Sequence, residues 1–275
     1  MKYNRNNKLR LFEACAGYGS QALALRRLRE LYPDFDYELV GWAEYDPFDL
    51  INPKDPDSHR PIEEQPAVIA HNALHPETIG KNWGDITTIM WDKLPDFDLL
   101  TYSTPCQSVS QAGLQHGFAE GSGTRSSIIW YVRDCVKAKR PKFLMLENVS
   151  AMVGARFVGL FNLWQKELED LGYVNFARVL NAKDYGVPQN RKRIFLISIL
   201  RTDDPNPKYF FPKPVPLEKC LADVLEENVD ESFFLSDEML ARFCEKSLEE
   251  ENGVVEETGQ DADGEIDFED FFVAQ

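Results

Sequence analysis

The first 200 residues alternate between short apolar runs and longer stretches in which apolar residues recur at helical spacing. The apolar runs predict strands over residues 8–15, 37–42, 97–102, 142–146 and 194–200. The helical spacing predicts helices over residues 20–31, 62–74, 126–139 and 157–171. Alternation of strands and helices predicts an α/β fold with a mostly parallel sheet covered by helices on both faces. Such sheets bind ligands outside the carboxyl ends of their strands, so we expect the functional residues there.

The last quarter of the chain has a different pattern. Residues 205–216 contain five prolines and predict an extended connector, followed by short helices over 217–225 and 236–243. From residue 245 onward there are 12 acidic residues, one Lys and few aliphatic residues, which predicts a disordered tail. We therefore expect a catalytic domain over 1–204, a connecting region over 205–244 and an acidic tail over 245–275.

Charge follows the same division. Residues 201–275 hold 22 acidic and 6 basic residues, which accounts for the whole net charge of −16 and leaves residues 1–200 with 24 of each. The acidic total is therefore no argument against nucleic-acid binding by the first 200 residues, whereas the tail is not expected to touch phosphates. The five cysteines are widely spaced with no CxxC pair, and the chain has neither a membrane-length apolar run nor a secretory signal. These features predict a cytoplasmic protein with reduced thiols, no metal site and no membrane contact.

Three features near predicted strand ends suit a nucleoside-containing cofactor. The sequence Ala16-Gly17-Tyr18-Gly19-Ser20 gives a glycine turn between a strand and a helix, where backbone can approach a ligand closely. Glu44 follows the next strand and can accept hydrogen bonds from ribose hydroxyls. Asp85 can accept from an adenine amino group, with Ile86 packed on the ring. Taken singly, each acid is better explained as a solvated loop residue.

Two further residues have the chemistry of a nucleophile and an acid. Cys106 follows a strand and begins a long polar loop, where a thiol is exposed and can be activated as a nucleophile. Glu147 directly follows the apolar run of residues 142–146, so we expect it at the carboxyl end of the sheet. A carboxylate there is poorly solvated and can serve as a general acid near neutral pH, although it could instead cap the next helix.

A basic sequence, Gln189-Asn190-Arg191-Lys192-Arg193, leads into the last predicted strand. Strand alternation places Arg191 and Arg193 on one face and Lys192 on the other. Two guanidinium groups on one face suit recognition of an anion or a carbonyl. The alternative is a basic strand end that protects against aggregation.

Taken in order, these elements resemble the DNA (cytosine-5) methyltransferase family. The resemblance rests on FEACAGYGS, Glu44, Gly84-Asp85-Ile86, TPCQSVSQAG, LENV and QNRKR, and it spans roughly residues 8–240. It implies a Rossmann-like, S-adenosylmethionine-dependent methyltransferase fold and double-stranded DNA as substrate. It also implies base flipping, attack of Cys106 on C6 of cytosine and protonation of N3 by Glu147.

The resemblance assigns roles residue by residue. Arg193 is expected to hold the cytosine carbonyl and Arg191 to orient the nucleophile loop. The expected cofactor contacts are Phe12, Ala16, Gly17, Tyr18, Gly19, Glu44, Tyr45, Asp85, Ile86 and Pro105. The expected substrate contacts are Gln107, Ser110, Asn148 and Gln189.

The sequence departs from the family pattern after the arginine motif. Family members carry a target-recognition region, a further Arg-x-Leu-Thr-Pro-Arg-like motif and a final Gly- and Asn-rich segment, none of which we find complete in residues 216–275. The stretch LADVLEENVDESFFLSDEML resembles the lead-in to the recognition region, so residues 205–244 are expected to hold the connector and the start of an incomplete target-recognition region. We hypothesise a truncated or split enzyme, with the missing part absent or on a second polypeptide. Two alternatives stay open: a tRNA cytosine-5 methyltransferase, and an inactive binding module. The complete set Cys106, Glu147, Arg191 and Arg193 speaks against inactivity.

Overall fold

The computed structural model describes residues 3–106, 109, 117–202 and 204–241. The chain divides into two units, Met1–Asp223 and Val224–Gln275. The first unit holds the sheet, its helices and the core, and all the features described below belong to it unless stated. The predicted acidic tail over 245–275 lies outside the described residues.

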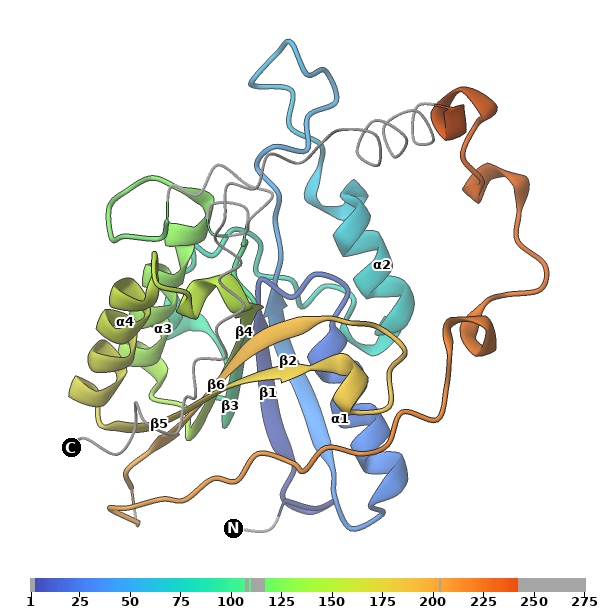
Figure 1. Ribbon diagram of the computed structural model, residues 1–275. Helices are drawn as coiled ribbons and strands as arrows, with labels where there is room; N and C mark the ends of the chain where they lie inside the picture. Colours follow the sequence, from blue (N-terminus) through green and yellow to red (C-terminus); the bar gives the residue numbers. More distant parts are fainter. Residues whose placement is uncertain (1–2, 107–108, 110–116, 203, 242–275) are drawn as a thin grey trace. The chain divides into compact units, whose positions relative to one another are not determined.

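Six strands form one sheet in the order β2-β1-β3-β4-β6-β5 (Figure 1). The strands are β1 (Leu9–Ala14), β2 (Tyr37–Ala43), β3 (Leu99–Tyr102), β4 (Phe143–Val149), β5 (Tyr173–Asn181) and β6 (Lys192–Leu200). The first four are parallel, and β6 runs antiparallel to both β4 and β5. The predicted α/β fold with a mostly parallel sheet is confirmed.

Helices cover both faces of this sheet, with α1 and α2 on one side and α3 and α4 on the other (Figure 1). Their bounds are α1 (Ser20–Leu31), α2 (Pro66–Leu74), α3 (Ile129–Lys139) and α4 (Val158–Asp170). The main core lies under α3 and α4, where Trp164 and Val132 pack against Leu100, Tyr102 and Leu146. Since strand residues alternate between faces, Leu9 and Leu11 of β1 instead pack with α1 in a smaller core.

The structure corrects several predicted bounds. The helix predicted over 62–74 is broken at Gln65, which is extended, because the residue before a proline avoids the α region and Pro66 starts α2. Residues 125–128 form a 3-10 turn, so α3 begins only at Ile129. The strand β4 continues to Val149, which places Glu147 inside the strand rather than after it.

The strand β5 was not predicted, and it lies at the edge of the sheet. Most of its side chains are half-buried on both faces, so the sequence has no clear two-residue alternation. The predicted connector over 205–216 is extended, and part of it contacts this end of the sheet. Tyr209 packs against Phe176 of β5, and Val215 pairs with Tyr185.

The two short helices predicted beyond the connector are partly described. Leu221–Val224 forms a single 3-10 turn within the predicted 217–225, and residues 237–241 are helical at the boundary of the described part. Apolar side chains of the second unit are exposed, among them Phe233 and Phe234. Among the described residues, no helix is both long and apolar enough to cross a bilayer.

Candidate active site at the carboxyl edge of the sheet

The glycine turn, Glu44, Cys106 and Glu147 lie at one edge of the sheet because of its topology. Parallel strands β1 to β4 all end at this edge, carrying the glycine turn, Glu44, Cys106 and Glu147 in that order. The antiparallel β6 begins at the same edge, so the basic motif can precede its strand and still lie beside β4. Val149 of β4 is paired directly with Arg193 of β6.

The glycine turn between β1 and α1 is left-handed at three positions. Cys15, Gly17 and Gly19 have φ values of 52°, 55° and 79°, and the latter two are positions where glycine removes the strain. A Cβ on Gly17 would meet no heavy atom within 4 Å, so the space in front of this residue is open. Tyr18 is exposed at the tip of the turn, and Ala16 is buried against Trp42.

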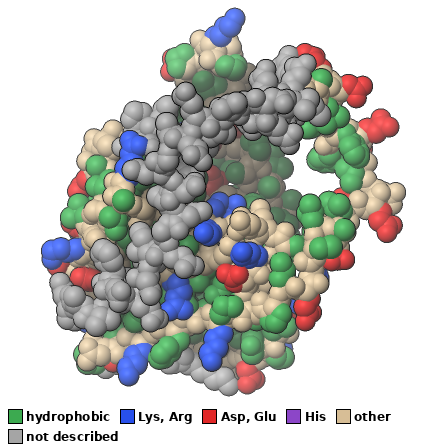
Figure 2. Space-filling view, viewed as in Figure 1, with side chains coloured by type: hydrophobic (Ala, Val, Ile, Leu, Met, Phe, Trp, Pro, Cys, Tyr) green, Lys and Arg blue, Asp and Glu red, His purple; other side chains and the backbone are tan. Residues whose placement is uncertain are grey.

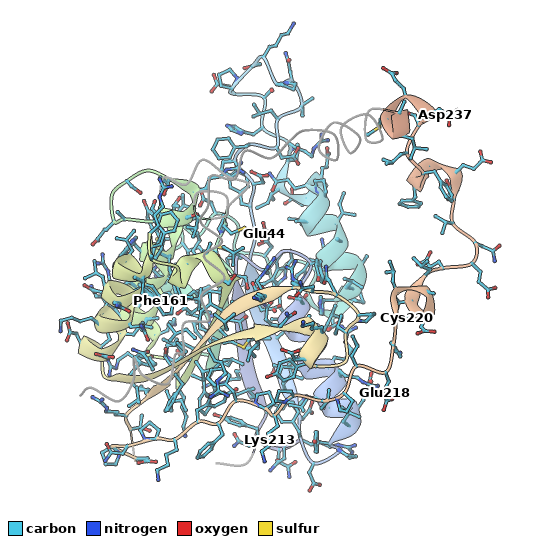
Figure 3. All side chains as sticks on the ribbon, in the orientation of Figure 1. Glu44, Phe161, Lys213, Glu218, Cys220 and Asp237 are labelled. Atoms are coloured by element: carbon cyan, nitrogen blue, oxygen red, sulfur yellow. The ribbon has the colours of Figure 1, made fainter. Side chains whose placement is uncertain are left out.

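Glu44 is tied to this turn and to the segment that contains Asp85. Its Oε2 accepts the Gly17 N–H at 2.7 Å. Its backbone exchanges two hydrogen bonds with the Asn82 side chain, whose Oδ1 also accepts the Gly84 N–H. Burial raises the pKa of Glu44, and the nearby Asp46 adds to this effect while the Gly17 N–H opposes it. Figure 3 labels Glu44 at this edge of the sheet.

The other predicted adenine contacts have separate roles in the local fold. Asp85 Oδ1 accepts the Thr87 N–H at 2.8 Å and so closes a short turn. Ile86 is buried in the main core, beneath that turn. Neither observation tests their predicted contact with a cofactor.

A hollow of about 510 Å³ lies in front of these strand ends. It is lined by Glu44, Tyr45, Pro105 and Cys106 together with residues of the 46–48 and 123–131 segments. The predicted ribose acid and the predicted nucleophile thus face one space. On its rim, the Arg125 guanidinium lies 3.7 Å from the Phe48 ring centroid and 3.1 Å from Asp46 Oδ1. This contact joins the loop after β2 to the segment before α3, and no sequence pattern predicts it.

Two buried side chains hold the backbone that leads to Cys106. Asn148 Nδ2 donates to the Thr104 carbonyl at 3.0 Å, and Ser126 Oγ donates to the Pro105 carbonyl at 2.7 Å. Asn148 was predicted to contact substrate, but its amide points into the protein and is nearly fully buried. Of the predicted loop contacts, Gln107 and Ser110 lie outside the described residues.

Glu147 and Arg193 form an ion pair with Nε and Oε1 3.2 Å apart. Each side chain is 23% exposed, so both groups of the pair are largely shielded from solvent. Arg193 Nη1 also donates to the Lys192 carbonyl, which limits where the guanidinium can point.

The rest of the basic motif is a turn organised by Asn181 at the end of β5. Its Oδ1 accepts the Arg191 N–H at 3.0 Å, and its Nδ2 donates to Asn190. Arg191 and Gln189 are exposed, and Arg191 precedes β6 instead of alternating within it. Asn181 was missed because β5 itself was missed.

Phe12 is a correction to the predicted cofactor contacts. It is fully buried on the α3–α4 face of β1 and stacks on Phe97 with ring centroids 5.2 Å apart. No surface of this ring is left for a ligand. The residue at the strand end is Cys15, which is partly exposed beside the glycine turn, and burial with the nearby Glu44 raises the pKa of its thiol.

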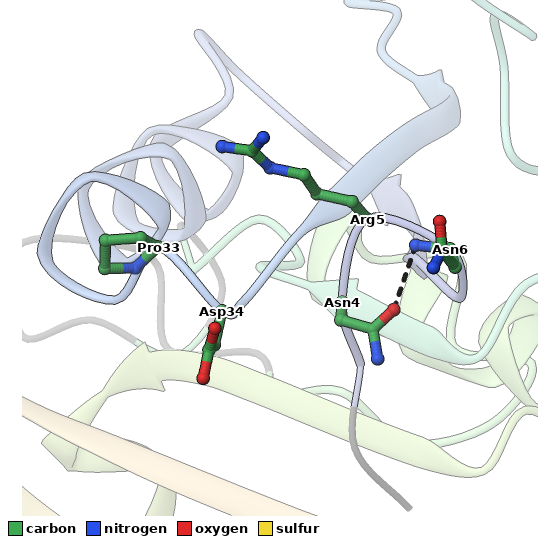
Figure 4. A pocket seen from close by; sticks show the side chains of 5 residues that line it. All are labelled: Asn4, Arg5, Asn6, Pro33 and Asp34. Atoms are coloured by element: carbon green, nitrogen blue, oxygen red, sulfur yellow. Dashed lines mark hydrogen bonds between the residues drawn. The ribbon is translucent and has the colours of Figure 1, made fainter.

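A second hollow of about 490 Å³ lies at the opposite edge, before β1 and β2 (Figure 4). It is lined by Asn4, Arg5, Asn6, Pro33 and Asp34, and Asn4 Oδ1 accepts the Asn6 N–H. None of the predicted site residues that the structure describes lines it. Its location at the amino ends of the strands is not where parallel α/β sheets place their ligands.

Comparison with known proteins agrees with the arrangement at the carboxyl edge. The model of the C-5 cytosine-specific DNA methylase family matches residues 9–263. The chain belongs to this family. It is 38% identical over 266 residues to the type II methyltransferase M2.ScrFI of Lactococcus lactis subsp. cremoris, which covers 85% of this chain and 72% of that protein. It is 34% identical to the orphan methyltransferase M.SssI of Spiroplasma monobiae, over 82% of this chain and 67% of that protein.

Solved structures agree in fold with this member of the methylase family. The Dnmt2 methyltransferase of S. pombe superposes with a TM-score of 0.59 at 19% identity, covering 86% of this chain and 67% of that one. The methyltransferase EhMeth of Entamoeba histolytica superposes with a TM-score of 0.55 at 15% identity, covering 85% and 64%. The expected Rossmann-like methyltransferase fold and the family resemblance are therefore confirmed.

Proposed function

We propose that this family member transfers a methyl group from S-adenosylmethionine to C5 of cytosine in double-stranded DNA, with Cys106 as nucleophile and Glu147 as acid. The observation that carries the assignment of roles is the meeting of four strand ends. Cys106 and Glu44 line one hollow, and the Glu147–Arg193 pair lies at the same edge of the sheet.

The residues around the hollow suit the cofactor. Gly17 leaves open space, and the largely buried Glu44 carboxylate can accept hydrogen bonds from ribose hydroxyls. Tyr45 and Pro105 add apolar surface to the same hollow. When bound, S-adenosylmethionine supplies an electrophilic methyl group on a sulfonium.

The reaction follows from the chemistry of the cytosine ring. The target base is turned out of the duplex, and the Cys106 thiolate forms a bond to C6. Attack pushes an electron pair into the ring, and Glu147 protonates N3 to relieve that charge. C5 then carries the electron density and accepts the methyl group. Loss of the C5 proton re-forms the C5–C6 double bond and breaks the bond to Cys106.

Arg193 has a double role in this proposal. Its ion pair with Glu147 fixes the carboxyl group, and its remaining N–H groups can hold the cytosine carbonyl. Asn148 acts on the nucleophile through the Thr104 backbone and is therefore a positioning residue.

Basic side chains suit the DNA backbone. Figure 2 shows Lys and Arg side chains gathered near the middle of one face, where β5 and β6 cross the view. Lys183 and Arg191 are exposed in the turn between those strands, and Lys192 is exposed at the start of β6. Cations in such a position can pair with phosphates and hold a duplex near the site without reading its sequence. A second polypeptide that supplies sequence recognition stays a prediction.

The test is mechanism-based trapping. The protein is incubated with S-adenosylmethionine and a mixed-sequence duplex in which cytosine is replaced by 5-fluorocytosine, because fluorine at C5 prevents release of the enzyme. We expect a covalent protein–DNA adduct with the unchanged chain and none with Cys106→Ser. Cys220→Ser, which removes an exposed thiol elsewhere, is the matched control and keeps the adduct.

The outcome distinguishes the alternatives. An adduct that survives Cys106→Ser would contradict the assigned nucleophile. Methyl transfer to tRNA but not to duplex DNA in a parallel assay would contradict the proposed substrate. No transfer to either nucleic acid by a folded chain would favour the binding-module alternative or a split enzyme that lacks its second polypeptide.

A further inference from the structure

Beneath the glycine turn lies a buried cluster of Glu13, His71 and His75, each with 0% of its surface exposed. Glu13 comes from β1, and both histidines come from α2 and its carboxyl end. The His71 ring stacks on Trp42 with ring centroids 3.6 Å apart. The reaction proposed above uses none of these side chains, although burying three ionisable groups is costly.

Hydrogen bonds fix the tautomer of His75. Arg26 Nη2 lies 3.0 Å from His75 Nδ1, and a guanidinium can only donate, so Nδ1 accepts. The ring proton of neutral His75 is therefore on Nε2, which lies 3.2 Å from the Gly19 carbonyl and donates to it. Burial lowers the pKa of His75, and the nearby His71 and Arg26 add to this effect.

The Gly19 carbonyl links the glycine turn to the start of α1, because it accepts two hydrogen bonds. Besides the His75 ring N–H, it receives the Leu23 N–H at 3.0 Å, which is the first hydrogen bond of α1. Glu13 Oε1 accepts the Ala22 N–H at 2.9 Å in the same first turn. A Cβ on Gly19 would lie 2.5 Å from His75 Nε2, so the contact occupies space that only glycine leaves.

We propose that His75, oriented by Arg26, is a positioning residue for the cofactor turn. By donating to the Gly19 carbonyl from the buried side, it holds residues 16–20 in the conformation that offers open space at Gly17 and a Gly17 N–H to Glu44. This inference rests on the proposed use of S-adenosylmethionine. The glycine turn is thus held from two sides, by Glu44 at Gly17 and by His75 at Gly19.

Two substitutions of His75 distinguish the effect of its hydrogen bond to Gly19 from the effect of packing alone. The amide nitrogen of glutamine reaches the position of the histidine Nε2, whereas the shorter asparagine amide reaches only the position of Nδ1. His75→Gln therefore keeps a donor for Gly19, and His75→Asn loses it. His59→Asn, which changes an exposed histidine in the loop after β2, is the matched control.

The measurements are the affinity for S-adenosylmethionine by calorimetry and amide hydrogen exchange over residues 16–23 without ligand, both on the full chain. We expect His75→Asn to weaken binding at least tenfold and to accelerate exchange. We expect His75→Gln to bind within threefold of the unchanged protein. His59→Asn changes neither quantity.

Equal affinity and equal exchange for His75→Asn, His75→Gln and the unchanged protein would overturn the inference. If His75→Asn does not fold, Arg26→Met is measured instead. This substitution leaves the His75 ring in place but removes the guanidinium that fixes the tautomer of that ring. Faster exchange over 16–23 is expected there, and unchanged exchange would overturn the inference. An unchanged protein that binds no S-adenosylmethionine would contradict the proposed cofactor, while the exchange measurement still tests the positioning by His75.

Discussion

The two halves of the site are held in different ways. On the cofactor side, the glycine turn is fixed by Glu44, Glu13 and His75, three charged or ionisable side chains that are largely or fully buried. On the nucleophile side, the backbone before Cys106 is held by neutral side chains, through hydrogen bonds from Asn148 to Thr104 and from Ser126 to the Pro105 carbonyl.

This difference indicates that one side of the site is fixed for cofactor binding and the other is arranged for the chemical step. Burying ionisable groups is costly, and fixing one conformation in advance of binding lowers the cost of binding. The nucleophile must instead approach a base that arrives with the DNA. Changes on the nucleophile side should therefore lower turnover without changing cofactor affinity, and changes on the cofactor side should do the reverse.

The largest effect is expected at Glu147. Glu147→Gln removes the proton donor, so we expect turnover to fall about 10²- to 10⁴-fold while the affinity for S-adenosylmethionine stays unchanged. Single-turnover methylation and calorimetry measure the two quantities. Arg193→Lys keeps a cation beside Glu147, so we expect a smaller loss of turnover than for Glu147→Gln. If Glu147→Gln keeps turnover within tenfold of the unchanged protein, Glu147 is not the proton donor.

An intermediate effect is expected where the nucleophile segment is anchored. Asn148→Ala leaves the buried Thr104 carbonyl without its donor, which costs about 1–3 kcal/mol of stability, and we expect turnover to fall about tenfold. Ser126→Ala frees the Pro105 carbonyl and should act in the same direction. Ser122→Ala, at an exposed position, is the control. A loss of cofactor affinity equal to the loss of turnover would contradict the division between the two sides.

The smallest effect on turnover is expected at Glu44. Because burial raises the pKa of this carboxyl above its ordinary value of 4.5, ionising it opposes folding as the pH rises through the raised pKa. Glu44→Gln should therefore raise the melting temperature by a few degrees at pH 7, and this gain should vanish below about pH 4.5. The same change should weaken cofactor binding about tenfold. A lower melting temperature at pH 7 would refute this account.

The sequence predicted the fold where periodicity was strong and the site where polar residues follow apolar strands. The bounds of α1 matched the prediction, and Glu44 and Cys106 face one hollow. Phe12 was misassigned because sequence alone does not say which face of β1 it occupies. The strand β5 was missed because an edge strand half-buried on both sides shows no alternation.

Other residues were missed because their role depends on contacts across the sequence. Asn82, Asn181, Ser126 and Arg26 act through hydrogen bonds to distant backbone or rings. A polar residue of this kind has no local pattern that distinguishes it from a solvated one. His75 has the same difficulty, since a buried histidine in a helix end gives no periodic signal.

The insertion of β6 between β4 and β5 sets the order in which the enzyme can become competent during synthesis. The nucleophile, the cofactor turn and Glu147 all leave the ribosome before β6, but β5 has no direct pairing with β4 and can join the sheet only through β6. Until then Glu147 lacks the guanidinium of Arg193. In a growing chain, Glu147 therefore acquires its partner Arg193 only when β6 joins the sheet.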